Sequence, residues 1–171
     1  LWRFGQLFGQ FRQFPLSLLD PPQIIVKKLL EIEPDVISGN AGVLARVSAE
    51  FLDAGEIPSR LKFVVTGAEV LTPMMKSAIG RAFRCPVYDT YASEELDLIA
   101  WECRETGLYH VCDDHLLLEI ERNGRTASAG EPGDVIATSL HLTAQPFLRY
   151  RLGDEARIGE PVCGCGLPFS T

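Results

Sequence analysis

The first half of the chain alternates between amphipathic segments and short apolar runs. Apolar residues recur at helical spacing after Pro21-Pro22, between Asn40 and Ala54, and after Thr72-Pro73. Compact apolar runs at 35–39, 61–65 and 86–90 have the length of buried strands. The β-α-β-α-β order with short connections predicts a mostly parallel sheet flanked by helices, an α/β fold.

Two helix ends carry capping signals. Thr72 and Pro73 suit the N-cap and the first helical position, and Gly55 suits a C-terminal stop after Ala54. We therefore expect helices to begin at Pro73 and to end at Ala54.

The pattern changes after about Cys103. The segments 116–121, 134–140 and 147–151 alternate or run apolar, with Gly and Pro between them. We predict an α/β portion over 1–102 and a β-rich C-terminal portion over 103–171, joined as one unit.

Composition narrows the class of protein. The 171 residues are 46% hydrophobic and carry a net charge of −7, which disfavours a general nucleic-acid binder. We expect no signal peptide and no membrane-spanning helix, and we predict a cytoplasmic protein. Five cysteines, an odd number without a secretory signal, favour free thiols or a metal site over disulfides.

In parallel α/β sheets ligands gather where strands end, and such ends are expected here at Gly39-Asn40, at 67–69 and from Tyr91 onward. Three short motifs carry the candidate chemistry. The first is Gly67-Ala68-Glu69, whose small residues allow a flat ring to approach the backbone. The alternative is a glycine that a tight turn requires.

The second motif is Tyr91-Ala92-Ser93-Glu94-Glu95. Tyr91 can lie against a nucleobase, Ser93 and Glu94 can approach phosphate, and the Glu95 carboxylate can bind magnesium. Alternatively, Ser93 caps a helix whose first turn carries Glu94 and Glu95.

The third motif is Tyr150-Arg151-Leu152-Gly153-Asp154. Asp154 can accept hydrogen bonds from both ribose hydroxyls. The alternative is a β-turn with Gly153 and Asp154 at its corner.

In this order the three motifs resemble the adenylate-forming superfamily, and within it phenylacetate–CoA ligase and its capsule-biosynthesis relatives. The segments 34–39, 102–110 and 114–120 are also similar to that subgroup. The resemblance implies that Gly67, Ala68 and Glu69 line the adenine, Tyr91 stacks on it and Asp154 binds the ribose. It also implies that Glu95 is a catalytic ligand of Mg²⁺.

The resemblance further implies an ATP-dependent ligase that converts a small carboxylic acid to an acyl-adenylate and transfers it to coenzyme A. The acid is expected near Gly39-Asn40 and the strand end 89–91. Three positions depart from the family pattern, because Ala92 replaces a Gly, Glu94 replaces the phosphate-contacting Thr, and Leu152 replaces a Thr. Since the family's phosphate loop and lid lysine are not found between Leu1 and Thr171, we expect a central fragment that is inactive alone.

Three cysteines and one histidine suggest a structural zinc site. Cys163 and Cys165 form a tight pair, and Cys103 and His110 lie seven residues apart around a turn. The resemblance also implies zinc between these segments, as in some members of the subgroup. Cys112 or His115 could replace His110, and the alternative is a set of unpaired buried thiols.

A second function remains open at this point. The chain could be a non-catalytic, zinc-stabilised interaction or oligomerisation module derived from such an enzyme, or an intact small α/β binding protein. A homodimer is compatible with either reading.

Overall fold

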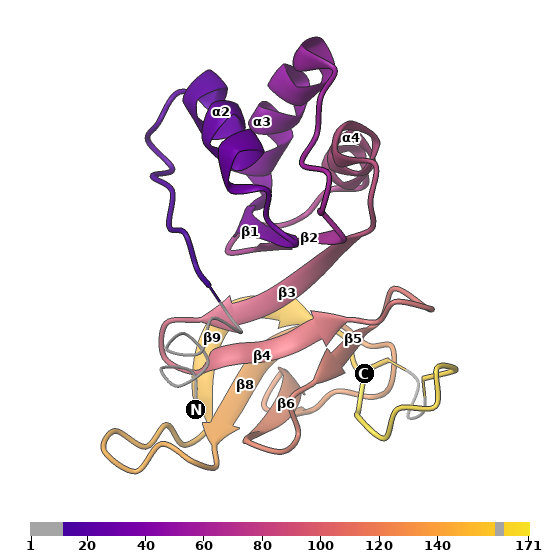
Figure 1. The fold of residues 1–171 in the computed structure, drawn as a ribbon. Coiled ribbons are helices and arrows are strands. Elements are labelled where there is room, and N and C mark those ends of the chain that lie inside the picture. Colours follow the sequence, from indigo (N-terminus) through magenta and orange to yellow (C-terminus); the bar gives the residue numbers. More distant parts are fainter. Residues whose placement is uncertain (1–11, 160–162) are drawn as a thin grey trace.

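The computed structural model describes residues 12–159 and 163–171 (Figure 1). Its helices are α2 (Pro22–Ile32), α3 (Ala41–Ala54) and α4 (Pro73–Phe83). Its strands are β1 (Val36–Asn40), β2 (Phe63–Gly67), β3 (Val87–Ser93), β4 (Asp97–Glu102), β5 (Tyr109–Val111), β6 (Leu116–Arg122), β7 (Arg125–Thr126), β8 (Gly133–Ser139) and β9 (Tyr150–Ala156). No helix in the described ranges is long and apolar enough to cross a membrane.

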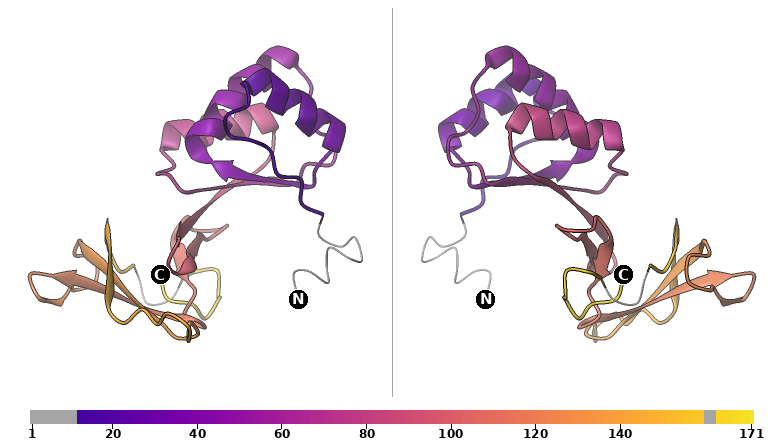
Figure 2. Two further views of the ribbon diagram at one scale, coloured as in Figure 1. Left: turned by 90° about the vertical axis from the view of Figure 1, so that its left-hand side faces the viewer. Right: turned by 90° about the vertical axis from the view of Figure 1, so that its right-hand side faces the viewer.

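The first sheet is mixed, with strand order β1-β2-β3-β4-β5. The pairs β1–β2 and β2–β3 are parallel, whereas β3–β4 and β4–β5 are antiparallel. Helices α2, α3 and α4 lie together on one side of β1 and β2 (Figures 1 and 2). The predicted parallel sheet with helical cover is therefore confirmed, and β3 is the strand at which it becomes antiparallel.

The helices begin and end where the sequence predicts. The Thr72 hydroxyl accepts a hydrogen bond from the Met75 amide at 3.2 Å, which caps α4, and Gly55 ends α3 in the left-handed region at φ 74°. Phe51 of α3 packs against Phe83 of α4 with ring centroids 4.8 Å apart. Both rings are almost fully buried, and they anchor the helices to the sheet.

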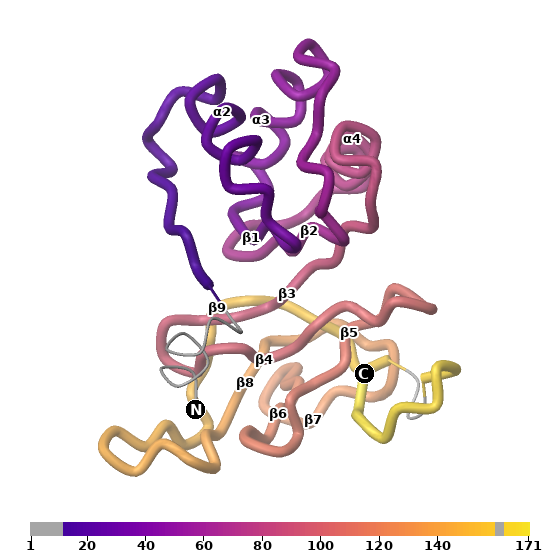
Figure 3. The backbone as a smooth tube through the Cα atoms, viewed as in Figure 1, coloured from indigo at the N-terminus to yellow at the C-terminus, as the bar shows by residue number. Residues whose placement is uncertain are grey.

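The second sheet is antiparallel, with strand order β7-β6-β8-β9. Its inner face buries Leu116, Ile120 and Val135. Tyr91 from β3 packs against two apolar clusters, one around Ile99 and Leu116 and one around Ile120 and Val135. The two sheets therefore meet at the end of β3. The tube in Figure 3 follows β3 as it passes beside β9.

Two of the alternative structural readings are wrong. Tyr91–Ser93 extend β3 rather than start a helix, and the chain returns as β4 after a short turn. Tyr150–Asp154 lie in β9 rather than at a turn, because the strand starts three residues later than the apolar run at Phe147 indicates. Tyr91–Ser93 and Tyr150–Asp154 consequently sit on paired strands, and Glu94 and Glu95 lie in the turn after β3.

Candidate functional site

The second and third motifs meet through two reciprocal hydrogen bonds. The Tyr91 hydroxyl donates to Asp154 Oδ2 at 2.6 Å, and the Tyr150 hydroxyl donates to Glu95 Oε1 at 2.8 Å. Each tyrosine thus holds the carboxylate of the other motif. Residues some sixty positions apart in the sequence are thereby brought into one site.

Irregular strand pairing determines the direction in which the Tyr91 and Asp154 side chains point. The β3–β4 register shifts between Tyr91 and Ala92, and the β8–β9 register shifts opposite Gly153, whose φ is 89°. Bulges of this kind bend a strand and redirect its side chains. A left-handed φ also explains the glycine before Asp154.

The two contacts set the charge of the site. Burial, together with the hydrogen bond to Asp154, raises the pKa of the Tyr91 phenol well above its usual range. The Tyr150 hydroxyl lowers the pKa of the Glu95 carboxyl. Around neutral pH, Tyr91 is consequently a neutral donor and Glu95 is an ionised acceptor.

The first motif lies at the carboxyl end of β2. A side chain at position 67 would come within 2.8 Å of Thr90 Oγ1, and the Thr90 hydroxyl donates to the Thr66 carbonyl at 2.7 Å. Glycine is therefore required here by the close approach of β3, and Ala68 follows it at φ 62°.

Glu69 faces the start of helix α3. Its carboxylate accepts from the Gly42 amide at 3.0 Å and from Asn40 Nδ2 at 3.4 Å. A carboxylate is favoured at a helix N-terminus, so the side chain serves as a distant cap for α3. Because the Glu69 side chain is used in this way, a ligand at this strand end would contact the backbone of Glu69 and not its side chain.

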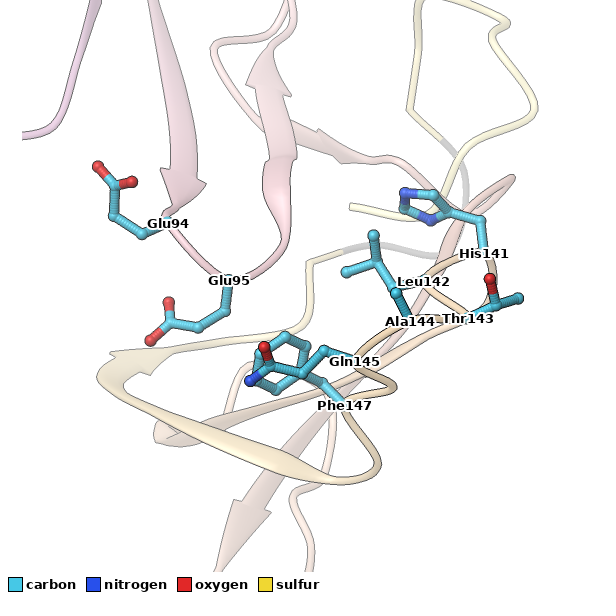
Figure 4. Close-up of a pocket in the computed structure, with 8 residues that line it drawn as sticks. All are labelled: Glu94, Glu95, His141, Leu142, Thr143, Ala144, Gln145 and Phe147. Atoms are coloured by element: carbon cyan, nitrogen blue, oxygen red, sulfur yellow. The ribbon is translucent and has the colours of Figure 1, made fainter.

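A hollow of about 570 Å³ lies beside the turn that follows β3 (Figure 4). Glu94 and Glu95 come from that turn, while the rest of the lining comes from the segment between β8 and β9. Those other residues are His141, Leu142, Thr143, Ala144, Gln145 and Phe147. Ser93 is engaged locally, because its hydroxyl accepts from the Leu96 amide at 3.2 Å.

Sequence reasoning missed the 141–147 wall of this hollow. The segment has no repeating pattern, and His141 stands in it without a neighbouring partner in the sequence. Only the pairing of β9 with β8 brings it opposite Glu95.

The structure brings the four predicted metal ligands together. The ligand atoms of Cys103, His110, Cys163 and Cys165 all lie within 4.8 Å of one another. Cys103 Sγ is 3.5 Å from Cys163 Sγ, and Cys165 Sγ is 3.3 Å from His110 Nε2. Three sulfurs and one imidazole nitrogen at this spacing fit a closed tetrahedral zinc site.

The surroundings of this cluster support that fit. His110 is fully buried, and its Nδ1 has no hydrogen-bond partner in the described part of the chain. Hydrogen bonds from Thr106, first from its hydroxyl and then from its amide, lower the pKa of the Cys103 thiol to about 5. A thiol with that pKa is a thiolate at neutral pH, which is the form that binds metal.

The two alternative ligands lie outside the cluster. His115 places Nε2 2.9 Å from the Leu98 carbonyl, and its Nδ1 lies 3.0 Å from Asp114. Cys112 is buried, and burial raises the pKa of its thiol. His110 is accordingly the histidine of the four-residue set.

Known proteins are similar to this chain over most of its length. No protein-family model matches it. It is 28% identical over 142 residues to protein CapK of Staphylococcus aureus, a match that covers 78% of the chain and 28% of CapK. It is 27% identical over 148 residues to phenylacetate–coenzyme A ligase of Thermus thermophilus, covering 82% of the chain and 33% of that enzyme.

The fold matches solved acyl–CoA ligases. A 2-hydroxyisobutyryl-CoA ligase in complex with 2-HIB-AMP and CoA aligns with a TM-score of 0.82 at 19% identity, covering 94% of this chain and 37% of that one. A benzoate CoA ligase from Burkholderia xenovorans aligns with a TM-score of 0.62 at 16% identity, covering 84% and 33%.

These matches define the class of protein. The chain has the fold of solved acyl–CoA ligases, with a mixed sheet, helical cover and a β-rich C-terminal part, and its sequence is similar to members of the adenylate-forming superfamily. Within that superfamily it is similar to the phenylacetate–CoA ligase and CapK subgroup, as its motifs indicate. It spans about a third of the length of the curated relatives it matches.

Proposed function

We propose that this chain provides the nucleotide-binding part of an AMP-forming carboxylate–CoA ligase. The observation that carries the proposal is the exchange of hydrogen bonds between Tyr91 and Asp154 and between Tyr150 and Glu95. These bonds hold close together the Tyr91 ring, the Asp154 carboxylate that could accept from ribose hydroxyls, and the Glu95 carboxylate that could bind a metal ion. The similarity to coenzyme A ligases supports the same reaction class.

The nucleoside would lie between β3 and β9. The Tyr91 ring would stack on adenine, while the backbone at Gly67, Ala68 and Glu69 would contact its edge. Asp154 accepts one phenolic hydrogen bond and has further lone pairs on its two oxygens, so it can also accept from ribose hydroxyls.

Glu95 would hold magnesium at the phosphate end. The Tyr150 phenol donates to Oε1, and a carboxylate keeps further lone pairs that can serve as hard oxygen ligands. Bound Mg²⁺ supplies positive charge where a carboxylate attacks the α-phosphate of ATP and pyrophosphate leaves. In the second step, the coenzyme A thiol attacks the acyl carbon and AMP leaves.

The phosphate contacts would differ from the usual family pattern. Glu94 lines the hollow in place of a hydroxyl residue, and the Ser93 hydroxyl is engaged with Leu96. We infer that Glu94 acts on phosphate only through a metal ion, because a bare carboxylate repels phosphate.

We further propose that Cys103, His110, Cys163 and Cys165 bind a structural zinc ion. The cluster lies at the β4–β5 hairpin and the C-terminal segment, away from the hydrogen-bonded motifs. Its role would be to join these two segments and to contribute folding free energy.

Pyrophosphate exchange tests the proposed activity. The protein as its gene encodes it should exchange labelled pyrophosphate into ATP only when a carboxylic acid is supplied, because exchange requires a reversible acyl-adenylate. An aryl acid and a short hydroxy acid are suitable first probes. A protein that folds and binds zinc but shows no exchange with any acid of a broad panel would favour the non-catalytic module.

A smaller effect is expected at Tyr150. Tyr150→Phe removes the phenol that fixes Glu95, so the Mg²⁺ concentration for half-maximal exchange should rise roughly two- to tenfold. The acid limb of the pH profile should move to higher pH, since the hydroxyl keeps the pKa of Glu95 low in the folded protein. Both are measured by exchange assays across magnesium concentration and pH.

Tyr88→Phe is the matched control. Tyr88 lies on the same strand as Tyr91, and its ring packs against Phe63 with centroids 5.9 Å apart. If both variants have the same magnesium requirement as the unmodified protein, Tyr150 does not position Glu95.

A further inference from the structure

The metal cluster and the nucleotide strand are joined by two residues that neither site uses. Glu102 directly precedes Cys103, and Tyr109 directly precedes His110. The two residues are register partners across β4 and β5. A metal ion that holds Cys103 and His110 in place would therefore also hold Glu102 and Tyr109 in place.

Both neighbours bind Asp89 on β3. Glu102 Oε2 accepts a hydrogen bond from the Asp89 amide at 2.9 Å, and the Tyr109 hydroxyl donates to Asp89 Oδ2 at 2.5 Å. The Thr66 hydroxyl donates to the other oxygen, Oδ1, at 2.5 Å. Asp89 is only 7% exposed, and a buried carboxylate of this kind is costly unless such partners hold it.

The junction reaches helix α4 as well. Lys76 forms an ion pair with Glu102 Oε1, whose side chain is 10% exposed. Burial, then the hydrogen bond to Asp89, raises the pKa of the Tyr109 phenol, so it stays a neutral donor. Strands β2, β3, β4 and β5 and helix α4 therefore converge on one partly buried polar junction around Asp89.

The junction lies two residues before Tyr91. Asp89 and Tyr91 share a face of β3, since side chains alternate along a strand. The Asp89 side chain and amide are held from β5 and β4, and those strands are held at the cluster. A change in the β4–β5 hairpin is consequently passed to β3 at Asp89.

We propose that Glu102 and Tyr109 are positioning residues that couple the Cys/His cluster to the nucleotide strand. In this view zinc bound at the cluster fixes the hairpin, the hairpin fixes Asp89, and Asp89 fixes the placement of Tyr91. The inference rests on the proposed function for its nucleotide readout. A merely structural junction would change stability and leave nucleotide affinity and the Tyr91 environment alone.

The test uses Tyr109→Phe, Glu102→Gln and the double variant, in the protein as its gene encodes it. Tyr109→Phe removes one oxygen atom, so it is the variant that most safely folds. Glu105→Gln, an exposed change in the same hairpin turn, is the matched control. Three quantities are measured for each: zinc per chain, affinity for AMP, and the NMR signal of the Tyr91 ring in tyrosine-labelled protein.

We expect the variants to keep about one zinc per chain. Their affinity for AMP should fall roughly three- to tenfold, and the Tyr91 signal should shift. Chelation of the unmodified protein should produce the same two changes. In the double variant chelation should add little, because the connecting contacts are already lost.

Two outcomes would overturn the inference. One is a set of zinc-loaded variants that keep both the AMP affinity and the Tyr91 signal of the unmodified protein. The other is a chelation effect on the Tyr91 signal of equal size in the double variant. If the unmodified protein fails to bind AMP while the Tyr91 signal responds as expected, the proposed function fails and the coupling stands.

Discussion

Cys163→Ser should remove bound zinc and lower the free energy of unfolding by about 3–5 kcal/mol, a large share of the 5–15 kcal/mol typical of a domain. The reason is the position of the sulfur. Cys163 is 1% exposed, and its Sγ lies 3.5 Å from Cys103 Sγ. Its loss would leave only three ligands, which no longer form a closed tetrahedral site. Metal analysis and chemical unfolding measure the two effects.

Cys112→Ala is the matched control for this prediction. Cys112 is equally buried but lies outside the cluster, so the variant should keep its zinc and lose about 1 kcal/mol from a small cavity. Chelator should destabilise the control and the unmodified protein alike, and leave Cys163→Ser unchanged. A purified protein free of zinc, with an unfolding midpoint indifferent to chelator, would contradict the structural metal.

Asp154→Ala should slow pyrophosphate exchange by at least about 100-fold. Two hydrogen bonds from ribose hydroxyls to a charged acceptor are worth about 1.5–3 kcal/mol each, and the alanine removes both. The Tyr91 phenol also loses its acceptor. Exchange kinetics at saturating magnesium, with the affinity for ATP measured separately, test the expectation.

The same variant makes a prediction about the pKa of Tyr91. Burial is the main reason that this pKa is raised. Asp154 raises it further, because its carboxylate accepts a hydrogen bond from the phenol and would repel the phenolate. In Asp154→Ala the pKa should therefore fall while staying above that of an exposed tyrosine, as an ultraviolet titration would show. Glu155→Gln, an exposed neighbour on β9, should change neither the exchange rate nor the titration. Full exchange activity in Asp154→Ala would remove Asp154 from the site.

Local signals predicted the helices well and one hairpin badly. Around Ser93 the capping signal is real, since the serine hydroxyl does accept from the amide three residues on. The helix does not continue, because Asp97 turns to φ 59° and the chain pairs back as β4, burying Ile99 and Ala100. Strand pairing between 90–93 and 97–101 outweighs the local cap there.

The candidate site divides in the same way. Cysteine and histidine spacing, together with the family resemblance, predicted the members of the cluster, with Cys112 and His115 left open as alternatives to His110. The polar junction around Asp89 could not be predicted, since it depends on which residue of β4 faces which residue of β5. The 141–147 wall was equally hidden, because a loop's neighbour is set by the strands that flank it.

Strand β3 pairs in two different ways along its length. Its beginning is parallel to β2, its end is antiparallel to β4, and Asp89 and Tyr91 occupy the changeover. Adding or deleting a single residue between them would turn the aromatic ring to the opposite side of the layer. The spacing between Asp89 and Tyr91 is therefore fixed by strand pairing on both sides, whereas the reversal at Asn123-Gly124 takes part in neither the polar junction nor the hydrogen-bonded motifs.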